Sequence, residues 1–539
     1  MDRRDFLHRL LLLSGGGLTP LLSGCGNSAP AAAGGGRFLH GVASGDPLAE
    51  AVIVWTRITP DDPAQPVAVA LELSDRPDFS APLRRLSALT DASRDHTVKL
   101  DLRDLSPDTR YWYRFRSGDQ VSPVGRTRTA PQAAVERLDF AVVTCSDYTR
   151  GLYNAYARVA EAEDLQAVIH LGDYIYEGGR TDRLRPHDPP RECLGLADYR
   201  RRYASYRETA ELQAVHAAHP MIWVWDDHES CDGAWIGGAD NHDESEDGPW
   251  ALRKAAAIQA AFEWLPIRPP DPAQPARIHR AFSFGPLCDL TMLDTRLIGR
   301  DQPLEPNLEQ GFSQTGAFAD PARELLGAEQ QDWAVASLAS RAPVWRLLGN
   351  QVVMAPLKIL GAPRALGGGV YANPDQWDGY EPARDRFLDA LQGLGLRNLV
   401  VLTGDVHASM AFDLVRDPNN PAAYEPLSGA GSEGVELVTP SISSAGENEE
   451  PAADPEQLVE QLIVRGSEAL RASNPHLKLF DASRNGWLRL RLSVSALRAE
   501  FWLVPTVRSE TAEQTLAYAF DVAEGSQRLV EDVSVRAGL

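Results

Sequence analysis

Five segments of the chain place metal-binding or phosphate-binding residue types directly after a run of apolar residues. The five endings are Thr144-Cys145, Gly172-Asp173-Tyr174-Ile175-Tyr176, Asp226-Asp227-His228-Glu229, Gly349-Asn350-Gln351 and Gly404-Asp405-Val406-His407. Sulfur and imidazole ligands suit first-row transition metals, and carboxylates suit harder divalent ions. One such ending is common, but five that together carry Cys, Asp, Tyr and His predict a single assembled metal site.

The apolar runs before these residues indicate which elements position them. The runs are 138–144, 167–171, 221–225, 344–348 and 398–403. Continuous apolar runs of this length are typical of buried parallel strands. In open α/β sheets, ligands bind just beyond the carboxyl ends of such strands. We therefore expect the five ends to meet in one crevice, which favours a metalloenzyme.

The segment around Asp173 is the expected bridge between two ions. Gly172 lets the backbone turn closely around a ligand, and Tyr176, three positions after Asp173, can return to the same ion. Asp405 and His407 can both reach ions if the chain leaves its strand as an extended turn. A Gly-Asp pair alone is a weak signal, so the prediction depends on the combination.

Four consecutive ionisable residues, 226–229, follow the third apolar run. Burying four charges without a metal would be costly, so we expect Asp227 to be a ligand and His228 to orient or protonate a leaving group. Asp226 or Glu229 would then hold His228 in place. Asp232 is a further candidate ligand, and a solvated acidic turn is the alternative for the whole segment.

Cys145 alone would be typical of a buried core cysteine. Beside the other strand endings it becomes a candidate thiolate ligand. A thiolate together with a tyrosinate from Tyr176 would be unusual for zinc and favours a strong Lewis acid such as Fe³⁺.

Two further residues could contact an anion. Arg150, with a helix expected to begin after Gly151, could cradle a phosphate, although an exposed arginine is the default. Asn350 could ligate a metal, hold a phosphate, or satisfy a turn. Asp294 and Arg296, by contrast, suggest a structural ion pair.

Length and charge limit the alternatives. A chain of 539 residues is too long for one average domain. Its formal charge of −22 argues against a nucleic-acid scaffold and against a basic membrane-binding face. Any phosphate site therefore needs local positive charge from arginine or metal.

The N-terminus has the features of an export signal. Arg3 and Arg4 begin a twin-arginine motif, and 22–25 resembles a bacterial lipobox whose Cys25 would become an acylated lipid anchor. We expect residues 1–25 to be the signal and 26–36 a flexible linker. The expected destination is the periplasm, or a membrane anchorage on the outer side of the inner membrane or at the outer membrane.

The remainder divides into two parts. From 37 to 130 short β candidates alternate with Pro, Asp and Ser, and 105–113 resembles the tyrosine corner of immunoglobulin and fibronectin type III sandwiches. We therefore expect a small all-β sandwich. From 131 to 539 strands alternate with helices, which indicates an α/β domain with a sheet-on-sheet core covered by helices.

With these residues placed, the chain resembles the PhoD-type alkaline phosphatases, a branch of the calcineurin-like metallophosphoesterases. The matching stretches are Cys145, 170–177, 225–229, 241–242, 293–296, 348–353, 403–407 and 439–444. The superfamily usually begins its motifs with Asp-x-His, whereas Thr144-Cys145-Ser146 stands here. The resemblance implies a four-layer αββα catalytic domain.

The resemblance also implies one Fe³⁺ with Ca²⁺. Iron would be surrounded by Cys145, Asp173, Tyr176 and His407. Asp173 would bridge to calcium, which Asp227 and Asp405 would complete. His228 and Arg150 would then serve the leaving group or the phosphoryl oxygens.

The function expected from the resemblance is alkaline phosphatase activity on phosphomonoesters and phosphodiesters, with a metal-activated oxygen as nucleophile, in a monomer. A phospholipase D-like or nucleotide phosphodiesterase activity at the same site is the alternative among enzymes. A non-catalytic surface lipoprotein is the alternative outside them.

Overall fold

The computed structural model describes residues 35–536, apart from 272, 275, 305–310 and 445–466. The predicted signal, and most of the predicted linker, lie outside the described residues. Within the described ranges, no helix is long and apolar enough to cross a lipid bilayer.

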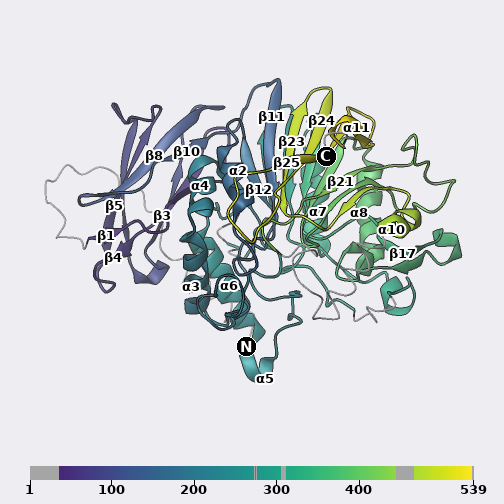
Figure 1. The fold of residues 1–539 in the computed structure, drawn as a ribbon, viewed down its shortest axis with the longest axis horizontal. Coiled ribbons are helices and arrows are strands. Elements are labelled where there is room, and N and C mark those ends of the chain that lie inside the picture. Colours follow the sequence, from purple (N-terminus) through teal and green to yellow (C-terminus); the bar gives the residue numbers. More distant parts are fainter. Residues whose placement is uncertain (1–34, 272, 275, 305–310, 445–466, 537–539) are drawn as a thin grey trace.

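Two large mixed sheets form the body of the molecule (Figure 1). The ten-stranded sheet has the order β26 (Val530–Glu531), β25 (Thr515–Ala523), β24 (Ala496–Leu503), β23 (Gly486–Ser493), β11 (Arg137–Val143), β12 (Ala167–His170), β13 (Pro220–Trp223), β2 (Val42–Gly45), β3 (Val52–Arg57) and β7 (Thr97–Leu102). The seven-stranded sheet has the order β14 (Arg280–Phe284), β15 (Cys288–Met292), β16 (Trp345–Gly349), β19 (Leu399–Thr403), β21 (Gly434–Val438), β20 (Ser409–Leu414) and β22 (Leu477–Asp481).

The five strands expected to carry the site are present, but they are divided between the sheets. β11, β12 and β13 are parallel neighbours in one sheet, and β16 and β19 are parallel neighbours in the other. The carboxyl ends of the two groups meet, because the backbone of Ile442, which follows β21, donates to the carbonyl of Thr144 at the end of β11. The predicted ligands therefore come from two sheets.

Helices cover the outer faces of the paired sheets. The longer helices are α2 (Asn154–Glu161), α3 (Leu196–Arg207), α4 (Ala210–Ala218), α6 (Trp250–Trp264), α7 (Ala328–Ala339) and α8 (Glu381–Gly393). The short helices are α5 (Glu244–Asp247), which projects away from the sheets in Figure 1, α10 (Ser467–Ser473) and α11 (Val533–Arg536). One buried cluster contains residues of both sheets, such as Val142 and Leu402, together with residues of α2 and α6. A second cluster joins α7 and α8 to the far side of the seven-stranded sheet. The layers are thus helix, sheet, sheet, helix.

A smaller β-sandwich occupies one end of the molecule (Figure 1). One sheet of the sandwich is formed by β2, β3 and β7 of the ten-stranded sheet. The other consists of β5 (Val67–Ser74), β6 (Arg84–Thr90), β8 (Arg110–Ser117), β9 (Gln120–Val121) and β10 (Gly125–Arg128). This sheet packs on β2, β3 and β7 through a buried apolar cluster. The hydroxyl of Tyr111 accepts a hydrogen bond from the backbone of Ser106 at 2.9 Å, as a tyrosine corner requires.

The sandwich is not a separate body beside the α/β part. β2 pairs in parallel with β13, and Pro220 lies opposite Ser44. One sheet of the sandwich therefore continues directly into the ten-stranded sheet, a connection that strand-by-strand periodicity does not predict.

The minor elements complete the fold. They are β1 (Gly36–Arg37) with β4 (Thr59–Pro60), β17 (Lys358–Gly361) with β18 (Gly369–Tyr371), and the 3-10 turns η1 (Ala92–Arg94), η2 (Gly316–Ala319), η3 (Arg364–Leu366) and η4 (Trp377–Tyr380).

Candidate metal centre

Four of the predicted metal ligands have a left-handed backbone, which side-chain-bearing residues rarely adopt. Their φ angles are 55° at Cys145, 56° at Asp173, 65° at Asp405 and 52° at His407. Such conformations are energetically costly, and they cluster at functional sites because they aim side chains that a regular strand end would direct elsewhere.

Gly172 permits the closest of these turns. Its φ is +105°, and a Cβ at this position would lie 2.3 Å from the backbone nitrogen of Asp226. The loops after β12 and β13 can therefore approach one another only because residue 172 has no side chain.

The first cluster joins the four residues expected around iron. Cys145 Sγ lies 3.4 Å from Asp173 Oδ2, and the hydroxyl of Tyr176 lies 3.1 Å from the same oxygen. Tyr176 is also 3.2 Å from His407 Nε2. The other oxygen of Asp173 is buried and has no hydrogen-bond partner within the described part of the chain. The sequence-based grouping of these four side chains is therefore matched by their geometry.

The electrostatics of this cluster suit a cation. Burial, followed by the charge of Asp173, raises the pKa of the Cys145 thiol well above its ordinary value, and the same two causes raise that of Tyr176. Burial also raises the pKa of Asp173. A bound metal supplies the positive charge that reverses such shifts, since it deprotonates a coordinating thiol. These donors therefore fit a strongly Lewis-acidic ion.

The surroundings of His407 favour its neutral form, which can act as a metal ligand. Burial, followed by the positive charge of Arg150, lowers its pKa to about 4. A neutral imidazole has a free nitrogen lone pair, which is the form that coordinates metals.

The second cluster consists of three aspartates. Asp226, Asp227 and Asp405 each place one carboxylate oxygen within 4.8 Å of the others. Asp227 accepts backbone N–H groups of His228 at 2.9 Å and Gly233 at 2.8 Å. Burial opposes its ionisation, but Arg296 and His228 lower its pKa below the ordinary range. Asp226, assigned from sequence to a supporting role, belongs to this cluster.

Arg296 is the main functional candidate that sequence reasoning misassigned. Asp294, its predicted partner, instead accepts backbone N–H groups of residues 296 and 297. The Arg296 guanidinium contacts Asp226, Asp375 and Asp405. The expected Asp294–Arg296 ion pair is therefore wrong, because the side chain turns toward charges that are distant in sequence. Asp375 follows no predicted strand and carried no sequence signal.

His228 stands beside the first cluster with one nitrogen fixed. Its Nδ1 lies 2.8 Å from Glu177 Oε2, and its ring is 4.2 Å from that of Tyr176. Desolvation opposes protonation, but the carboxylates of Glu177 and Asp227 raise the pKa of His228 well above its usual value. The side chain is 22% exposed, so part of the protonated imidazole is accessible to solvent. Glu177 was not singled out from the sequence.

Glu229 has a different task from the one expected. Its carboxylate accepts backbone N–H groups of Asp173, Tyr174 and Asp226. It therefore joins the two ligand loops, and the carboxylate that holds His228 is that of Glu177.

The side chain of Arg150 is 25% exposed to solvent. Its Nε is 3.3 Å from Asp147 Oδ2, and its charge acts on His407. The predicted helix after Gly151 begins at Asn154.

Asn350, for which the sequence left a metal-binding, phosphate-binding or turn role open, uses its side chain within its own turn. Its amide nitrogen donates to the carbonyl of Val352 and, at 3.2 Å, to Thr403 Oγ1. Its amide oxygen accepts the indole N–H of Trp377 at 3.0 Å. Because its side-chain donors and its oxygen are used to close the turn after β16, Asn350 has the structural role that the sequence left open.

Asp232 and a group formed by Glu177, Glu192 and Cys231 contain metal-binding residue types but belong to neither ligand cluster. Asp232 accepts from Asn241 Nδ2 at 3.0 Å, and burial raises its pKa to about 7. Glu177, Glu192 and Cys231 also approach one another. Both oxygens of Glu177 already accept hydrogen bonds, from His228 and from the backbone of residue 232. The group of Glu177, Glu192 and Cys231 therefore has the features of a polar network.

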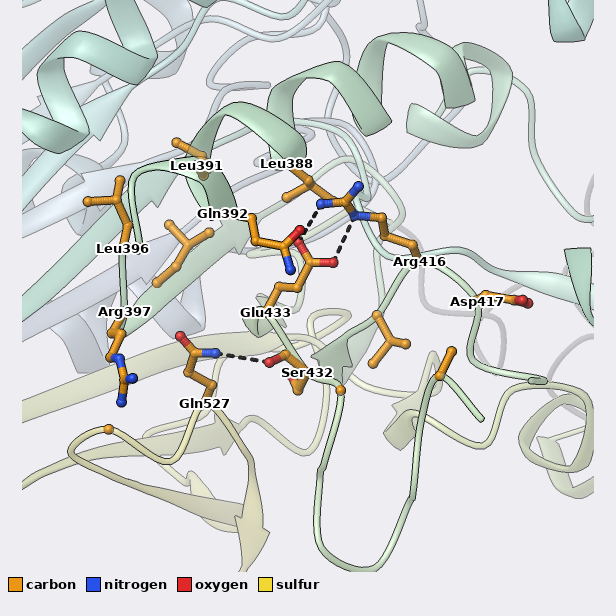
Figure 2. Close-up of a pocket in the computed structure, with 16 residues that line it drawn as sticks. Leu388, Leu391, Gln392, Leu396, Arg397, Arg416, Asp417, Ser432, Glu433 and Gln527 are labelled. Carbon is orange, nitrogen blue, oxygen red and sulfur yellow. Dashed lines mark hydrogen bonds and ion pairs between the residues drawn. The ribbon is translucent and has the colours of Figure 1, made fainter. Parts of the chain in front are cut away.

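A cavity of ≈ 690 Å³ lies elsewhere, between the end of α8, the turn before β19 and the 415–433 segment (Figure 2). Arg416 crosses it to Glu433, and Gln527 donates to the carbonyl of Ser432. None of the predicted ligands lines this cavity, so its size does not make it the site of chemistry.

Comparison with known proteins identifies the family of the chain that carries these two clusters. The model of a family described as PhoD-like phosphatase matches residues 140–501. The chain belongs to the PhoD-like phosphatases. A model of the N-terminal domain of PhoD-like phosphatases matches residues 24–131. The family assignment makes the chain a hydrolase of the alkaline phosphatase D type.

Individual relatives agree with the family model. The chain is 34% identical to alkaline phosphatase D of Bacillus subtilis (strain 168) over 526 residues, covering 93% of this chain and 84% of the relative. It is also similar to a solved structure described as "Structure of PhoD", with a TM-score of 0.81 and 31% identity, over 94% of this chain and 93% of that one. The similarity to PhoD proteins thus includes both the sandwich and the α/β domain.

Proposed function

We propose that this PhoD-like phosphatase hydrolyses phosphomonoesters and phosphodiesters at a mixed Fe³⁺/Ca²⁺ centre, as a monomer. The observation that carries the proposal is the adjacency of two unlike donor sets that share a boundary at Asp173. One set offers sulfur, phenol, imidazole and carboxylate. The other offers carboxylates alone.

Ligand charge supports the division between the two metals. Cys145, Tyr176 and Asp173 would supply three negative charges as ligands, and His407 none, which balances a trivalent ion. The aspartate cluster of residues 226, 227 and 405 has the oxygen donors that Ca²⁺ prefers. When bound, the metals would lower the pKa of a coordinated water and neutralise charge on the phosphoryl group.

The chain's own residues would handle the substrate as follows. His228, with Nδ1 donating to Glu177, keeps a proton on Nε2 that can be given to the departing ester oxygen. Arg150 can bind a non-bridging phosphoryl oxygen and supplies the local positive charge that the acidic surface lacks. Because only the leaving oxygen needs the proton from His228, either a monoester or a diester fits this arrangement.

Replacing Cys145 by Ala tests the iron assignment. The variant should lose most of its iron, the visible absorption that thiolate or tyrosinate bound to Fe³⁺ produces, and its rate on an aryl phosphate. Cys288→Ala is the matched control, because Cys288 is also buried but lies on β15 outside the clusters. A Cys145→Ala protein with full iron content and full rate would overturn the proposal, as would a colourless parent enzyme containing only zinc.

We also propose export by the twin-arginine route with lipid attachment at Cys25, supported by the motifs at residues 3–4 and 22–25. Replacing Arg3 and Arg4 by Lys should retain the protein in the cytoplasm. Cys25→Ser should release it from the membrane fraction without abolishing export. Unchanged fractionation of both variants would contradict the proposal.

A further inference from the structure

The Arg296 guanidinium is wholly buried and joins aspartates from three separate segments. Its Nε lies 2.5 Å from Asp226 Oδ1, after β13. One terminal nitrogen is 2.7 Å from Asp405 Oδ1, after β19, and the other is 2.8 Å from Asp375 Oδ2. A planar guanidinium with donors in a fixed fork can hold several carboxylates in one geometry, which a lysine cannot do.

The contacts with Arg296 leave part of each carboxylate available. Asp226 uses Oδ1 for Arg296, and its Oδ2 is buried without a hydrogen-bond partner among the residues that the structure describes. Asp405 uses Oδ1 for Arg296, while Oδ2 accepts from Gln376 at 2.6 Å. Each oxygen has a second lone pair, so Arg296 fixes the carboxylates without consuming their capacity to bind an ion.

The charges around this arginine suit one divalent ion. The carboxylates of residues 226, 227, 375 and 405 face two guanidinium groups, because Arg300 also contacts Asp375. When all four carboxylates are ionised, two negative charges remain for an ion to balance, apart from the charge of Asp173, which was counted with the first cluster. Without Arg296 three would remain, and a buried unbalanced charge is expensive.

We infer that Arg296 is a positioning residue that sets the aspartate cluster to bind a divalent rather than a trivalent cation, so that trivalent iron is confined to the neighbouring site of Cys145, Tyr176 and His407. This inference rests on the proposed metal centre. It concerns which ion each half accepts, a property separate from the rate of hydrolysis.

Competition between Ca²⁺ and Tb³⁺ on the iron-loaded full-length enzyme measures this preference. Tb³⁺ is of similar size to Ca²⁺ but carries one more charge, and its luminescence reports binding directly. Arg296→Gln should shift the ratio of Ca²⁺ to Tb³⁺ dissociation constants at least about tenfold in favour of Tb³⁺, since a unit charge a few ångströms away outweighs that factor at protein dielectric constants. Arg296→Lys keeps the charge and should keep the ratio near that of the parent even if both affinities fall.

Two further variants distinguish the effect of the Arg296 charge on ion preference from a purely structural effect of the arginine. Arg300→Gln makes the same change of charge, but Arg300 contacts only Asp375 among the four aspartates, so the ratio should move less than about threefold. Adding Asp375→Asn to Arg296→Gln restores the balance of charge and should return the ratio toward the parent. Asp375→Asn alone should shift it toward Ca²⁺, and it serves as the test if Arg296→Gln does not fold by circular dichroism.

A ratio unchanged in Arg296→Gln, with both ions weakened equally, would show that the arginine is merely structural and would overturn the inference. An equal shift in Arg300→Gln would do the same. A parent protein that binds neither iron nor calcium would instead refute the proposed metal centre, so the two failures are distinguishable.

Discussion

At the scale of single residues, the histidines show how surroundings decide what one side chain can do. His228 and His407 both contact Tyr176, the first through its ring and the second through the tyrosine hydroxyl. The carboxylate of Glu177 overcomes desolvation and keeps His228 protonated. At His407 the charges of Asp147 and Asp227 do not outweigh burial and Arg150, so that ring stays neutral. One histidine can therefore donate a proton while the other can donate a lone pair.

A third histidine, His476, links burial to acid stability. Burial lowers its pKa from 6.5 to about 3. Its Nε2 donates to the carbonyl of Pro356 at 2.9 Å, and its Nδ1 has no partner among the described residues. As the pH falls below 6.5 the unfolded chain takes up a proton before the folded chain does. This contribution to stability is therefore complete above pH 6.5 and is lost between pH 6.5 and about 3.

His476→Gln should make the protein less sensitive to acid, because Gln can still donate to Pro356 but does not titrate. The free energy of unfolding, measured with denaturant at pH 7 and pH 4.5, should fall by roughly 2–3 kcal/mol less in the variant than in the parent. The measurement at pH 7 is the internal control for packing. An identical fall in both proteins would contradict the assigned pKa.

At the scale of elements, the strands and helices nearest the site were predictable from local patterns. The apolar run 398–403 corresponds to β19, and the run 167–171 corresponds to β12, with ends within one residue. Strand ends also located six ligand candidates, because parallel strands deliver their last residues to one edge.

The remaining features depend on contacts that no local pattern contains. The division of the five strands between two sheets follows from pairing over long sequence distances. Asp375 lies in a loop before η4, so it follows no apolar run. Asn350 has the residue type of a ligand, but its amide is used by Val352, Thr403 and Trp377, and only the folded turn shows this.

The turn after β12 yields a prediction at this scale. Gly172→Ala should cost more than about 1 kcal/mol of stability and reduce iron content, because the new Cβ meets the Asp226 backbone and φ is +105°. Denaturant unfolding and metal analysis measure both effects. Gly178→Ala, in the same loop, would place its new Cβ with no atom within 4 Å, so its stability should stay within about 0.5 kcal/mol of the parent. Equal behaviour of the two variants would be evidence against a strained ligand turn.

At the scale of the whole molecule, the sandwich and the α/β part share a sheet and a buried ion pair. Asp46, which follows β2, is 2.6 Å from Arg280 of β14, and both are buried. Asp46 also accepts the backbone N–H of Arg268 at 2.7 Å. Three segments from different layers are therefore tied to one carboxylate.

Asp46→Asn should destabilise the entire protein by about 3–5 kcal/mol, because it leaves Arg280 buried without its counter-charge. Hydrogen exchange should show equal loss of protection in β5 of the sandwich and β12 of the α/β part. Asp389→Asn, which removes a carboxylate that is 66% exposed from its pair with Arg416, should cost less than about 1 kcal/mol. Loss of protection confined to the sandwich would indicate two independent folding units.

The pairing of β11 with β23 also determines when, during synthesis of the chain, the ten-stranded sheet can be completed. β11, whose end carries Cys145, has β23 as its antiparallel neighbour, and Arg489 of β23 pairs with Asp139 of β11 across 350 residues of chain. At typical translation rates the ribosome needs roughly half a minute to make that interval. The strand that ends in Cys145 therefore gains this antiparallel neighbour only after most of the polypeptide has been made.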